Sequence, residues 1–443
     1  MASIAQENLF GWEEVEELGD LERLGLVLDH LPDEALMGAL ERDRGRGRDE
    51  YPVRAVWNSI LAGIVFGHES VESLRRELCR NAQLRVFCGF DPLKGILAVP
   101  SSSAYTRFLR GLVGRLKLIE ELFDVLVEEV RKVLPDFGRI LAMDSKALKS
   151  HGRRGKEGSK AKGADGRREN DADSGKKTYK GERKDGTLWE KVRSWFGFKV
   201  HLLVEANYEL PVGFEVTRAS VADINGGKDL LAQVGERHPE LVGEAQELVA
   251  DKAYDDTKWI TVLWDDYGIK PLIDIRSMWK DGEETRLVSG MENVVYDGRG
   301  AVYCYCSETG ERQEMAFGGF EKDRRSLKYR CPAHHYGLSC DALAQCPVTG
   351  PVRIPLSEDR RIFTPLARSS YAWERNYRKR TAVERVNSRL DVSFGFERHF
   401  IRGLKKMKVR MGLALCVMLS MALGRVKQNQ AKRMRSLVWS EAA

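Results

Sequence analysis

The sequence predicts an α/β fold: a mixed sheet flanked by helices, preceded by a helical N-terminal domain and interrupted by a small β-rich insertion that contains cysteines. Three observations predict it. Apolar residues recur at helical spacing through residues 15–130. Short apolar runs between 139 and 275 then end in aspartates and are followed by helical patterns, the order expected of an α/β sheet. Between 277 and 366, short strand-like runs, glycine turns and five cysteines replace that pattern.

Charge is spread unevenly along the 443 residues. The formal net charge is only +6, but acids crowd the first fifty residues, whereas bases crowd 149–193 and 375–435. Such asymmetry indicates a surface for nucleic acid. The eight cysteines are too scattered for a secreted disulfide framework, no signal peptide opens the chain, and the most apolar run, 411–423, is shorter than the roughly 20 residues that span a bilayer. We therefore expect a soluble protein of the cytoplasm, with 411–423 as a buried helix.

The first domain, residues 1–134, is expected to be helical. Pro52 opens an apolar segment with helical spacing, and Ser70 precedes another segment at the position of an N-cap. One or two long amphipathic helices follow "VPSSSAY", and Pro135 ends the block because proline interrupts a helix.

The second region, residues 135–276, reads as the first part of the α/β core. The run "RILAMDSKAL" predicts a buried strand that ends at Asp144. Fifteen bases and eight acids lie from 149 to 193 with few apolar residues, so 150–193 is expected to be a mobile basic loop, either functional or a solvated linker. Two strands around the turn "ANYELP" follow, then a strand that ends at Asp251, a helix over 256–268 and a strand over 269–275.

The insertion spans 277–366, and the C-terminal part of the core, with basic helices, spans 367–443. The insertion offers a candidate structural Zn²⁺ site, for which free thiols in a small β-rich lobe are the alternative, because the spacing lacks paired C-x2-C knuckles. Four thiolates could come from Cys304, Cys306, Cys331, Cys340 and Cys346, with His334 or His335 in reserve, and the expected ligands are Cys306, Cys331, Cys340 and Cys346.

Three acids stand out by position. Asp144 and Asp251 end predicted strands, and ends of neighbouring strands meet at one sheet edge. Glu384 lies in a later helix, surrounded by Arg and Lys. Three carboxylates suit two Mg²⁺ or Mn²⁺ ions, which clamp a phosphodiester. Alternatives stay open: Glu384 could form a surface salt bridge, and other acids are plausible decoys, namely Asp136, Asp223 (as a strand-end or helix-capping acid), Asp255 and Asp274.

Basic and aromatic residues near these acids are candidates for DNA contact. Tyr377, Arg380 and Glu384 recur on one helical face. Trp279 and Trp373 could stack on an unpaired base, although packing is the plainer role for both. The candidate DNA-binding residues are Tyr377, Arg380, Arg385, Arg389, Lys199, Lys405 and Lys406.

Four stretches together give the chain a known likeness. They are "LAMDSKAL", "WFGFKVHLLVEANYELPVGFEVTRASVADIN", "VADKAYDD" and "YRKRTAVERVNSRL", the last matching a Y-x2-R-x3-E signature. In this order they resemble DDE transposases of bacterial insertion sequences, the group with a ribonuclease-H-like catalytic core. The helical block at 50–115 is also similar to that group's N-terminal domain, so the likeness covers roughly 50–425.

The resemblance implies a DNA transposase that binds terminal inverted repeats and performs metal-dependent strand cleavage and strand transfer. It implies Asp144, Asp251 and Glu384 as the catalytic, metal-binding triad, and a nucleoid-associated homodimer that synapses two DNA ends through an N-terminal DNA-binding or dimerisation domain. One position departs from the pattern: Asp391 stands where the signature has Lys, so that phosphate contact must come from elsewhere, with Arg385, Arg389 or Lys405 as candidates. A non-catalytic or domesticated DNA-binding descendant, or a structure-specific nuclease without strand transfer, is the alternative.

Overall fold

The computed structural model describes residues 18–45, 50–154, 168–183, 185–276, 279 and 281–436. The chain divides into two compact units, each built from segments that are distant in sequence. Unit 1 comprises the described parts of Met1–Pro135, Lys149–Ala172 and Asn387–Ala443, and unit 2 comprises those of Asp136–Leu148 and Asp173–Val386. The domain boundaries predicted from the sequence remain a prediction, since they divide the chain differently.

Unit 1 is built around a long C-terminal helix, α15 (Leu404–Lys427), which packs against α8, α2, α4 and α7. Pro52 directly precedes α4, and the Ser70 side chain accepts a hydrogen bond from the Ser73 N–H, so both predicted helix starts are confirmed. The other elements are α2 (Leu21–His30), α3 (Glu34–Arg44), α4 (Val53–Val65), α5 (Val71–Arg80), α6 (Ala82–Phe87), η1 (Pro92–Ala98), α7 (Ser102–Val113), α8 (Leu116–Val133), β2 (Arg153–Arg154), β3 (Arg168–Glu169) and η4 (Ala431–Arg433).

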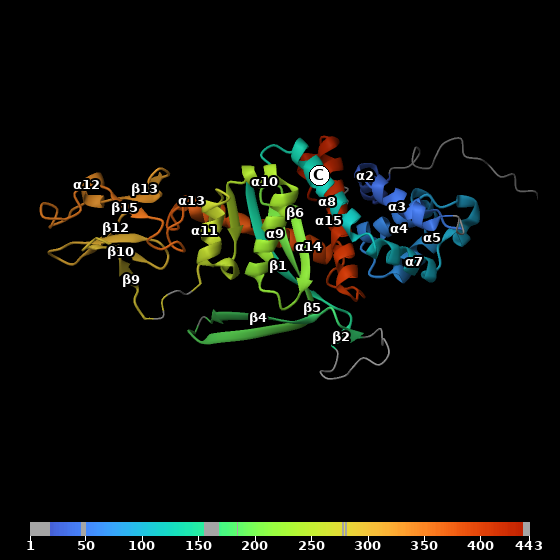
Figure 1. Cartoon of the computed structure of the whole chain (residues 1–443), viewed down its shortest axis with the longest axis horizontal. Coiled ribbons are helices and arrows are strands. Elements are labelled where there is room, and N and C mark those ends of the chain that lie inside the picture. The colour runs from blue at the N-terminus through green and yellow to red at the C-terminus, as the bar shows by residue number, and fades with distance from the viewer. Residues whose placement is uncertain are drawn as a thin grey trace, which may run out of the picture. The chain divides into compact units, whose positions relative to one another are not determined.

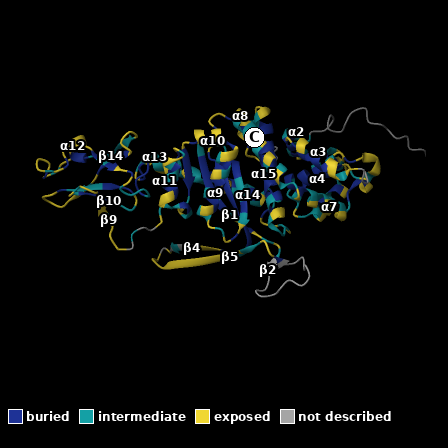
Figure 2. Ribbon diagram, in the orientation of Figure 1, coloured by how far each residue is buried: buried dark blue, intermediate teal, exposed yellow. Residues whose placement is uncertain are grey.

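The apolar run at 411–423 lies inside α15, as a buried helix (Figure 2). By length and composition alone this helix could cross a bilayer. However, 89% of its most apolar window is buried inside the protein, which is the pattern of a core helix.

Unit 2 contains a six-stranded mixed sheet in the order β4-β5-β1-β7-β8, with β6 paired to β5 (Figure 1). Strands β1, β7 and β8 run parallel, whereas β5 runs antiparallel to both β4 and β6. Helix α9 packs against β5 and β6, and α11 against β8. The bounds are β1 (Ile140–Lys149), β4 (Asp173–Glu182), β5 (Leu188–Glu205), β6 (Leu210–Arg218), α9 (Asp223–Arg237), α10 (Pro239–Glu244), β7 (Glu247–Ala250), η2 (Lys252–Tyr254), α11 (Thr257–Asp265), β8 (Lys270–Ile273), α13 (Tyr371–Tyr377), η3 (Arg378–Arg380) and α14 (Thr381–Val392).

The prediction of a basic loop over 150–193 is wrong for a large part of that range. Residues 173–182 form β4 and pair throughout with the first ten residues of β5, which makes a long two-stranded arm. Figure 2 shows this arm as largely exposed. The low apolar content that suggested a loop reflects strands that face solvent on both sides. Residues 155–167 of the predicted loop lie outside the described residues.

The segment predicted as a β-rich insertion forms two small antiparallel sheets with a shared apolar core that includes Val294, Leu327 and Ile354. One sheet has the order β12-β11-β10-β9 and the other β13-β14-β15. Their bounds, with one short helix, are β9 (Thr285–Leu287), β10 (Val294–Asp297), β11 (Val302–Tyr305), β12 (Arg312–Glu314), β13 (Ala316–Glu321), β14 (Ser326–Arg330), α12 (Pro332–Tyr336) and β15 (Val352–Pro355).

Candidate active site

Asp144 and Asp251 lie side by side on neighbouring parallel strands. Met143 of β1 pairs with Ala250 of β7, and each aspartate is the next residue in its chain. Neighbouring strands are about 4.8 Å apart, so the two carboxylates share one small region. Asp251 directly follows β7, as predicted, whereas Asp144 lies within β1, which continues to Lys149. The sequence therefore located the pair correctly but ended the first strand too early.

The Asp144 carboxyl is buried beside a second acid, and both facts affect its pKa. Burial, followed by the neighbouring Asp251 carboxylate, raises the pKa of Asp144 to about 6. The Ser145 N–H donates to Asp144 Oδ1 over 2.7 Å, and the charge of Lys177 also acts to lower this pKa, but neither outweighs the burial. The Asp251 carboxylate accepts a hydrogen bond of 2.7 Å from the Ala253 N–H.

A third aspartate, Asp223, joins the cluster at the first turn of α9. Its charge contributes to the raised pKa of Asp144. Lys199 Nζ lies 2.6 Å from Asp223 Oδ1 and 2.8 Å from the Val221 carbonyl. Hydrogen bonds from Lys199 and Ser145 lower the pKa of Asp223 despite its burial. Lys199 is itself buried and binds both of these partners, and its contact with DNA stays a prediction.

Glu384 lies on α14 and forms an ion pair with Arg380, at 2.8 Å between Oε1 and Nη1. The Glu384 side chain is 48% exposed, and Arg380 is less so at 26%. Arg380 is also near Asp144, because the charges of Glu384 and Asp144 both act to raise its pKa. The guanidinium thus connects the helix acid to the strand acids. In this structure Glu384 has the surface salt bridge that was one of its two predicted roles.

Tyr377 completes the helical side of the site. Elements α13 and η3 contact β7. Asn376 Nδ2 donates hydrogen bonds to both Glu247 carboxylate oxygens, at 2.9 and 3.0 Å. The Tyr377 ring stacks on Trp373, with ring centroids 4.7 Å apart and planes 10° apart. Burial, then the charge of Asp274, raises the pKa of Tyr377 to about 12. This tyrosine therefore stays a neutral hydroxyl at physiological pH.

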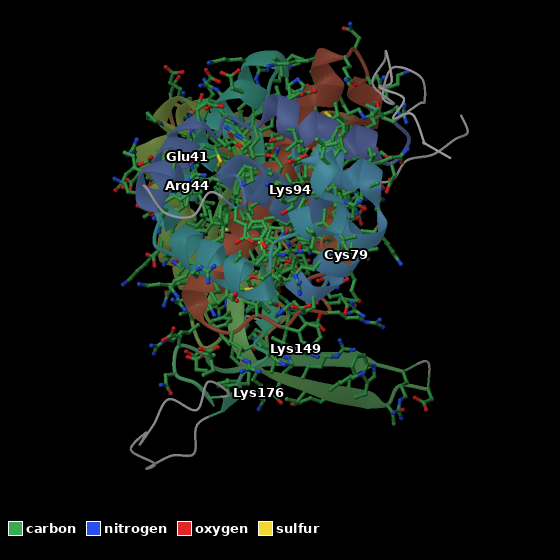
Figure 3. The ribbon with its side chains drawn as sticks, turned by 90° about the vertical axis from the view of Figure 1, so that its right-hand side faces the viewer. Glu41, Arg44, Cys79, Lys94, Lys149 and Lys176 are labelled. Atoms are coloured by element: carbon green, nitrogen blue, oxygen red, sulfur yellow. The ribbon has the colours of Figure 1, made fainter. Side chains whose placement is uncertain are left out.

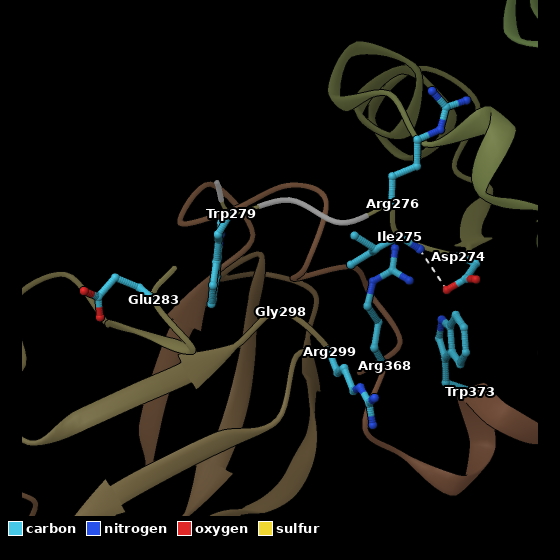
Figure 4. A pocket seen from close by; sticks show the side chains of 9 residues that line it. All are labelled: Asp274, Ile275, Arg276, Trp279, Glu283, Gly298, Arg299, Arg368 and Trp373. Carbon is cyan, nitrogen blue, oxygen red and sulfur yellow. Dashed lines mark hydrogen bonds between the residues drawn. The ribbon is translucent and has the colours of Figure 1, made fainter. Parts of the chain in front are cut away.

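Asp274, weighed only as a decoy from the sequence, extends the acidic row. It directly follows β8, where Ile273 pairs with Ala250 of β7, so Asp251 and Asp274 also end neighbouring parallel strands. Asp274 lines a cavity of about 530 Å³, drawn in Figure 4. The other lining residues are Ile275, Arg276, Trp279, Glu283, Gly298, Arg299, Arg368 and Trp373. Both tryptophans proposed for base stacking thus reach one cavity at the end of this row, and their stacking on a base stays a prediction.

The remaining candidate DNA contacts are spread over two units. Arg385 Nε lies 2.7 Å from Glu209 Oε1, so its charge is already offset within unit 2. Arg389 lies half-buried near the end of α14. Lys405 and Lys406 are exposed at the start of α15, in unit 1. Direct DNA contact by these residues remains a prediction.

The cysteines of the insertion lie close enough to influence one another. Burial, with the Cys331, Cys346 and Cys340 thiols, raises the pKa of Cys304 to about 11. Hydrogen bonds led by the Thr309 hydroxyl lower the pKa of Cys306 to about 7. Cys304, one of the five cysteines considered from the sequence but not among the four expected ligands, therefore lies close to three of those four.

Within the described part of the chain, no three His, Cys, Asp or Glu side chains gather closely enough to hold one metal ion. Neither the carboxylate triad nor the cysteine cluster is therefore preformed. The carboxylates nevertheless fit Mg²⁺ or Mn²⁺, because these cations prefer oxygen ligands and would offset the burial and the neighbouring Asp251 charge that raise the pKa of Asp144.

Comparisons with known proteins identify the family. A family model described as the transposase DDE domain matches residues 135–420. No curated protein matches the chain. A solved structure, the piggyBac transposase synaptic complex with hairpin DNA, shows 11% identity and a TM-score of 0.34 over 96% of this chain and 86% of that one. The family match covers more than half of the chain, including β1, β7 and α14 with their acids, and this chain therefore belongs to the DDE transposase family.

Proposed function

We propose that this transposase binds the terminal inverted repeats of a bacterial insertion sequence and catalyses metal-dependent cleavage of DNA strands and their transfer into target DNA. The observation that carries the proposal is the pair of adjacent carboxylates, Asp144 and Asp251. Each directly follows one of two paired residues on the parallel strands β1 and β7. The mixed sheet, with its three parallel strands, supports a ribonuclease-H-like core.

In this proposal Asp144, Asp251 and Glu384 hold two Mg²⁺ or Mn²⁺ ions, which would activate an attacking oxygen and stabilise the leaving one. Arg380 pairs with Glu384 and lies near Asp144, and it is available for a DNA phosphate once Glu384 turns toward the strand acids. Lys199 fixes Asp223 and so holds the start of α9 at the site. We further propose that a homodimer brings two DNA ends together.

One observation favours a second candidate, a DNA-binding descendant without catalysis. The Glu384 carboxylate is paired with Arg380 and is not gathered with the two aspartates. The alternative of a nuclease without strand transfer differs only in whether the freed 3′-hydroxyl joins target DNA.

The experiment compares two isosteric variants in the same helical segment. Glu384→Gln should abolish Mg²⁺-dependent cleavage of DNA that carries the element's end, by at least about a hundredfold, while binding in a gel shift persists. Glu374 is exposed and likewise forms an ion pair across one helical turn, with Arg378 at 2.5 Å. Glu374→Gln should therefore cleave like the unaltered protein. Undiminished cleavage by Glu384→Gln would reject the triad.

We also propose that the insertion holds one structural Zn²⁺ through thiolates drawn from its five cysteines. The mutual influence of Cys304, Cys331, Cys340 and Cys346 supports this, and so does the low pKa of Cys306, because zinc binds the thiolate.

A further inference from the structure

The β4–β5 arm of unit 2 has two chemically different faces. Side chains of a strand point alternately to opposite sides, and the register of the arm is fixed by ten consecutive pairs. On one face lie Trp189, Lys191, Arg193 and Trp195 of β5, with Lys177 opposite Arg193. On the other face lie Leu188, Glu190, Val192 and Ser194 of β5, with Ser174, Lys176 and Thr178 of β4. We call the first set the basic face.

Charge and shape both distinguish the basic face. Among the side chains that the structure describes there, Lys177, Lys191 and Arg193 are exposed cations, and the acid of this face, Asp173, lies at the base of the arm. On the opposite face Lys176 is accompanied by the acid Glu190, and exposed apolar residues such as Leu188 surround them. Alternating aromatic rings and cations are the chemistry that follows a nucleic-acid backbone.

Two glycines hold the tryptophans of the basic face in place. Gly175 pairs with Trp195, and Gly181 pairs with Trp189. A Cβ on Gly181 would meet Trp189 Cε2 at 2.6 Å, and one on Gly175 would overlap the Trp195 ring. Each ring therefore occupies the space that a partner side chain would fill opposite it.

The basic face continues into the acidic cluster. Along β5 the same alternation places Lys199 on the side of Trp195, and Lys199 binds Asp223. At the base of the arm, Asp173 Oδ1 accepts a hydrogen bond of 2.8 Å from the Ser220 N–H, which lies just before Asp223. The charge of Lys177 reaches Asp144. A strand held along this face would therefore lead to the carboxylates.

We propose that the basic face, through Lys177, Lys191 and Arg193 with Trp189 and Trp195, binds the backbone of the DNA strand that enters the carboxylate site. This inference rests on the proposed function, since it takes DNA as the substrate. The three cations contact phosphates and the two tryptophans pack against the strand, so these contacts add affinity and position without reading the sequence.

Adjacent lysines on β4 provide a matched test. Lys177 and Lys176 are both exposed, but they point to opposite faces. The probe is a fluorescently labelled 40-base-pair duplex of arbitrary sequence, titrated with the full chain across a series of salt concentrations. Lys177→Ala combined with Arg193→Ala should weaken binding at least about fivefold and reduce the slope of log K against log salt by about two, because each lost phosphate contact releases fewer counterions. Lys176→Ala should change neither quantity appreciably.

Fluorescence supplies a second readout. Subtracting the signal of Trp189→Phe from that of the unaltered chain isolates Trp189, and duplex should quench this difference signal. Equal effects of Lys176→Ala and of the Lys177→Ala/Arg193→Ala double variant, or no effect of either, would overturn the inference. Cleavage by Glu384→Gln tests only the proposed catalysis, whereas DNA binding by the arm variants tests only the basic face. The two hypotheses can therefore fail separately.

Discussion

Arg380 offsets the charge of two acids that the proposed reaction needs. It pairs with Glu384 and lies near enough to Asp144 for that carboxylate to raise its pKa. A half-exposed pair of this kind, four residues apart on a helical segment, contributes only about 0.3–0.5 kcal/mol. If the proposed divalent cation replaces the guanidinium at Glu384, the cost to folding is therefore small, and we propose that the arginine then binds a DNA phosphate.

The raised pKa of Asp144 predicts a pH-dependent gain in stability for Asp144→Asn. Asp144 has a pKa of about 6 in the folded protein, against 3.8 as the ordinary value. The folded state holds this proton more tightly than the unfolded chain, so ionisation favours unfolding, and stability is lost as pH rises from about 4 through about 6. At pH 7.5 without metal, Asp144→Asn should exceed the unaltered protein by roughly 1–3 kcal/mol in free energy of unfolding, with no advantage at pH 4.

Urea denaturation in EDTA from pH 4 to pH 8 measures this difference. Asp229→Asn is the control, because Asp229 is an exposed carboxylate on α9 and its loss should change stability by less than about 0.5 kcal/mol. Added Mg²⁺ should stabilise the unaltered protein more than Asp144→Asn. A pH-independent difference between Asp144→Asn and the unaltered protein would show that Asp144 ionises normally.

At this scale the sequence predicted the adjacent aspartates because both follow short buried runs. The sequence could not decide whether Glu384 pairs with Arg380 or gathers with the two aspartates, because the same helical spacing allows both arrangements. Asp274 was within reach of the same reasoning: it follows "KPLI" as Asp251 follows "ELVA", but no likeness to a motif distinguished it from other acids.

Helix α9 approaches the sheet closely because two consecutive glycines face it. A Cβ on Gly227 would lie 2.6 Å from both Met143 Sδ and Tyr254 Cε1, and one on Gly226 would overlap the His201 ring. Met143 and Tyr254 are fully buried, and they flank Asp144 and Asp251 in the chain. The spacing of the helix from the sheet therefore also sets the position of the two strand acids.

Gly227→Ala should destabilise the protein and disturb the site together. The added methyl group overpacks a dense interior, which typically costs about 1–3 kcal/mol, and it must displace Tyr254 or Met143. Gly235→Ala is the matched control on the same helix, since its Cβ would meet only Tyr267 Cε1, at 4.0 Å. That change should stabilise by up to about 1 kcal/mol through helix propensity. Thermal unfolding of both variants checks the signs, and equal signs would contradict this account of the packing.

Elements with a buried face were predictable, and the exposed arm was not. Strands β1, β7 and β8 are marked by buried apolar residues, whereas the outer half of β5 is exposed throughout. The arm instead has cross-strand pairs of tryptophan with glycine. These pairs cannot be recognised in the sequence until the register of the two strands is known.

The molecule as a whole combines a discontinuous core with a nearly self-contained insertion. Unit 2 gathers 136–148 and 173–386, a division that local patterns could not reveal because it depends on which distant segments pair. Within it, the two small sheets of the insertion have their own apolar core, and Trp264 of α11 meets Phe320 of β13 edge-on, with ring centroids 5.6 Å apart. We therefore expect the insertion, whose ion pairs to the α11 region include Arg325–Asp265 and Arg361–Asp255, to lose order more readily than the mixed sheet.

Removal of zinc should expose that independence. If thiolates of the insertion hold one Zn²⁺, the purified full chain contains about one zinc per molecule, and a strong chelator lowers hydrogen-exchange protection in β10–β15 while β1 and β7 stay protected. Cys331→Ser should lose the metal and reproduce this local opening. Cys79→Ser, which removes an exposed cysteine from α5 in unit 1, should retain both metal and protection. Because a structural zinc contributes directly to folding free energy, a metal-free chain with a fully protected insertion would mean that its apolar core suffices and that the cysteines are ordinary free thiols.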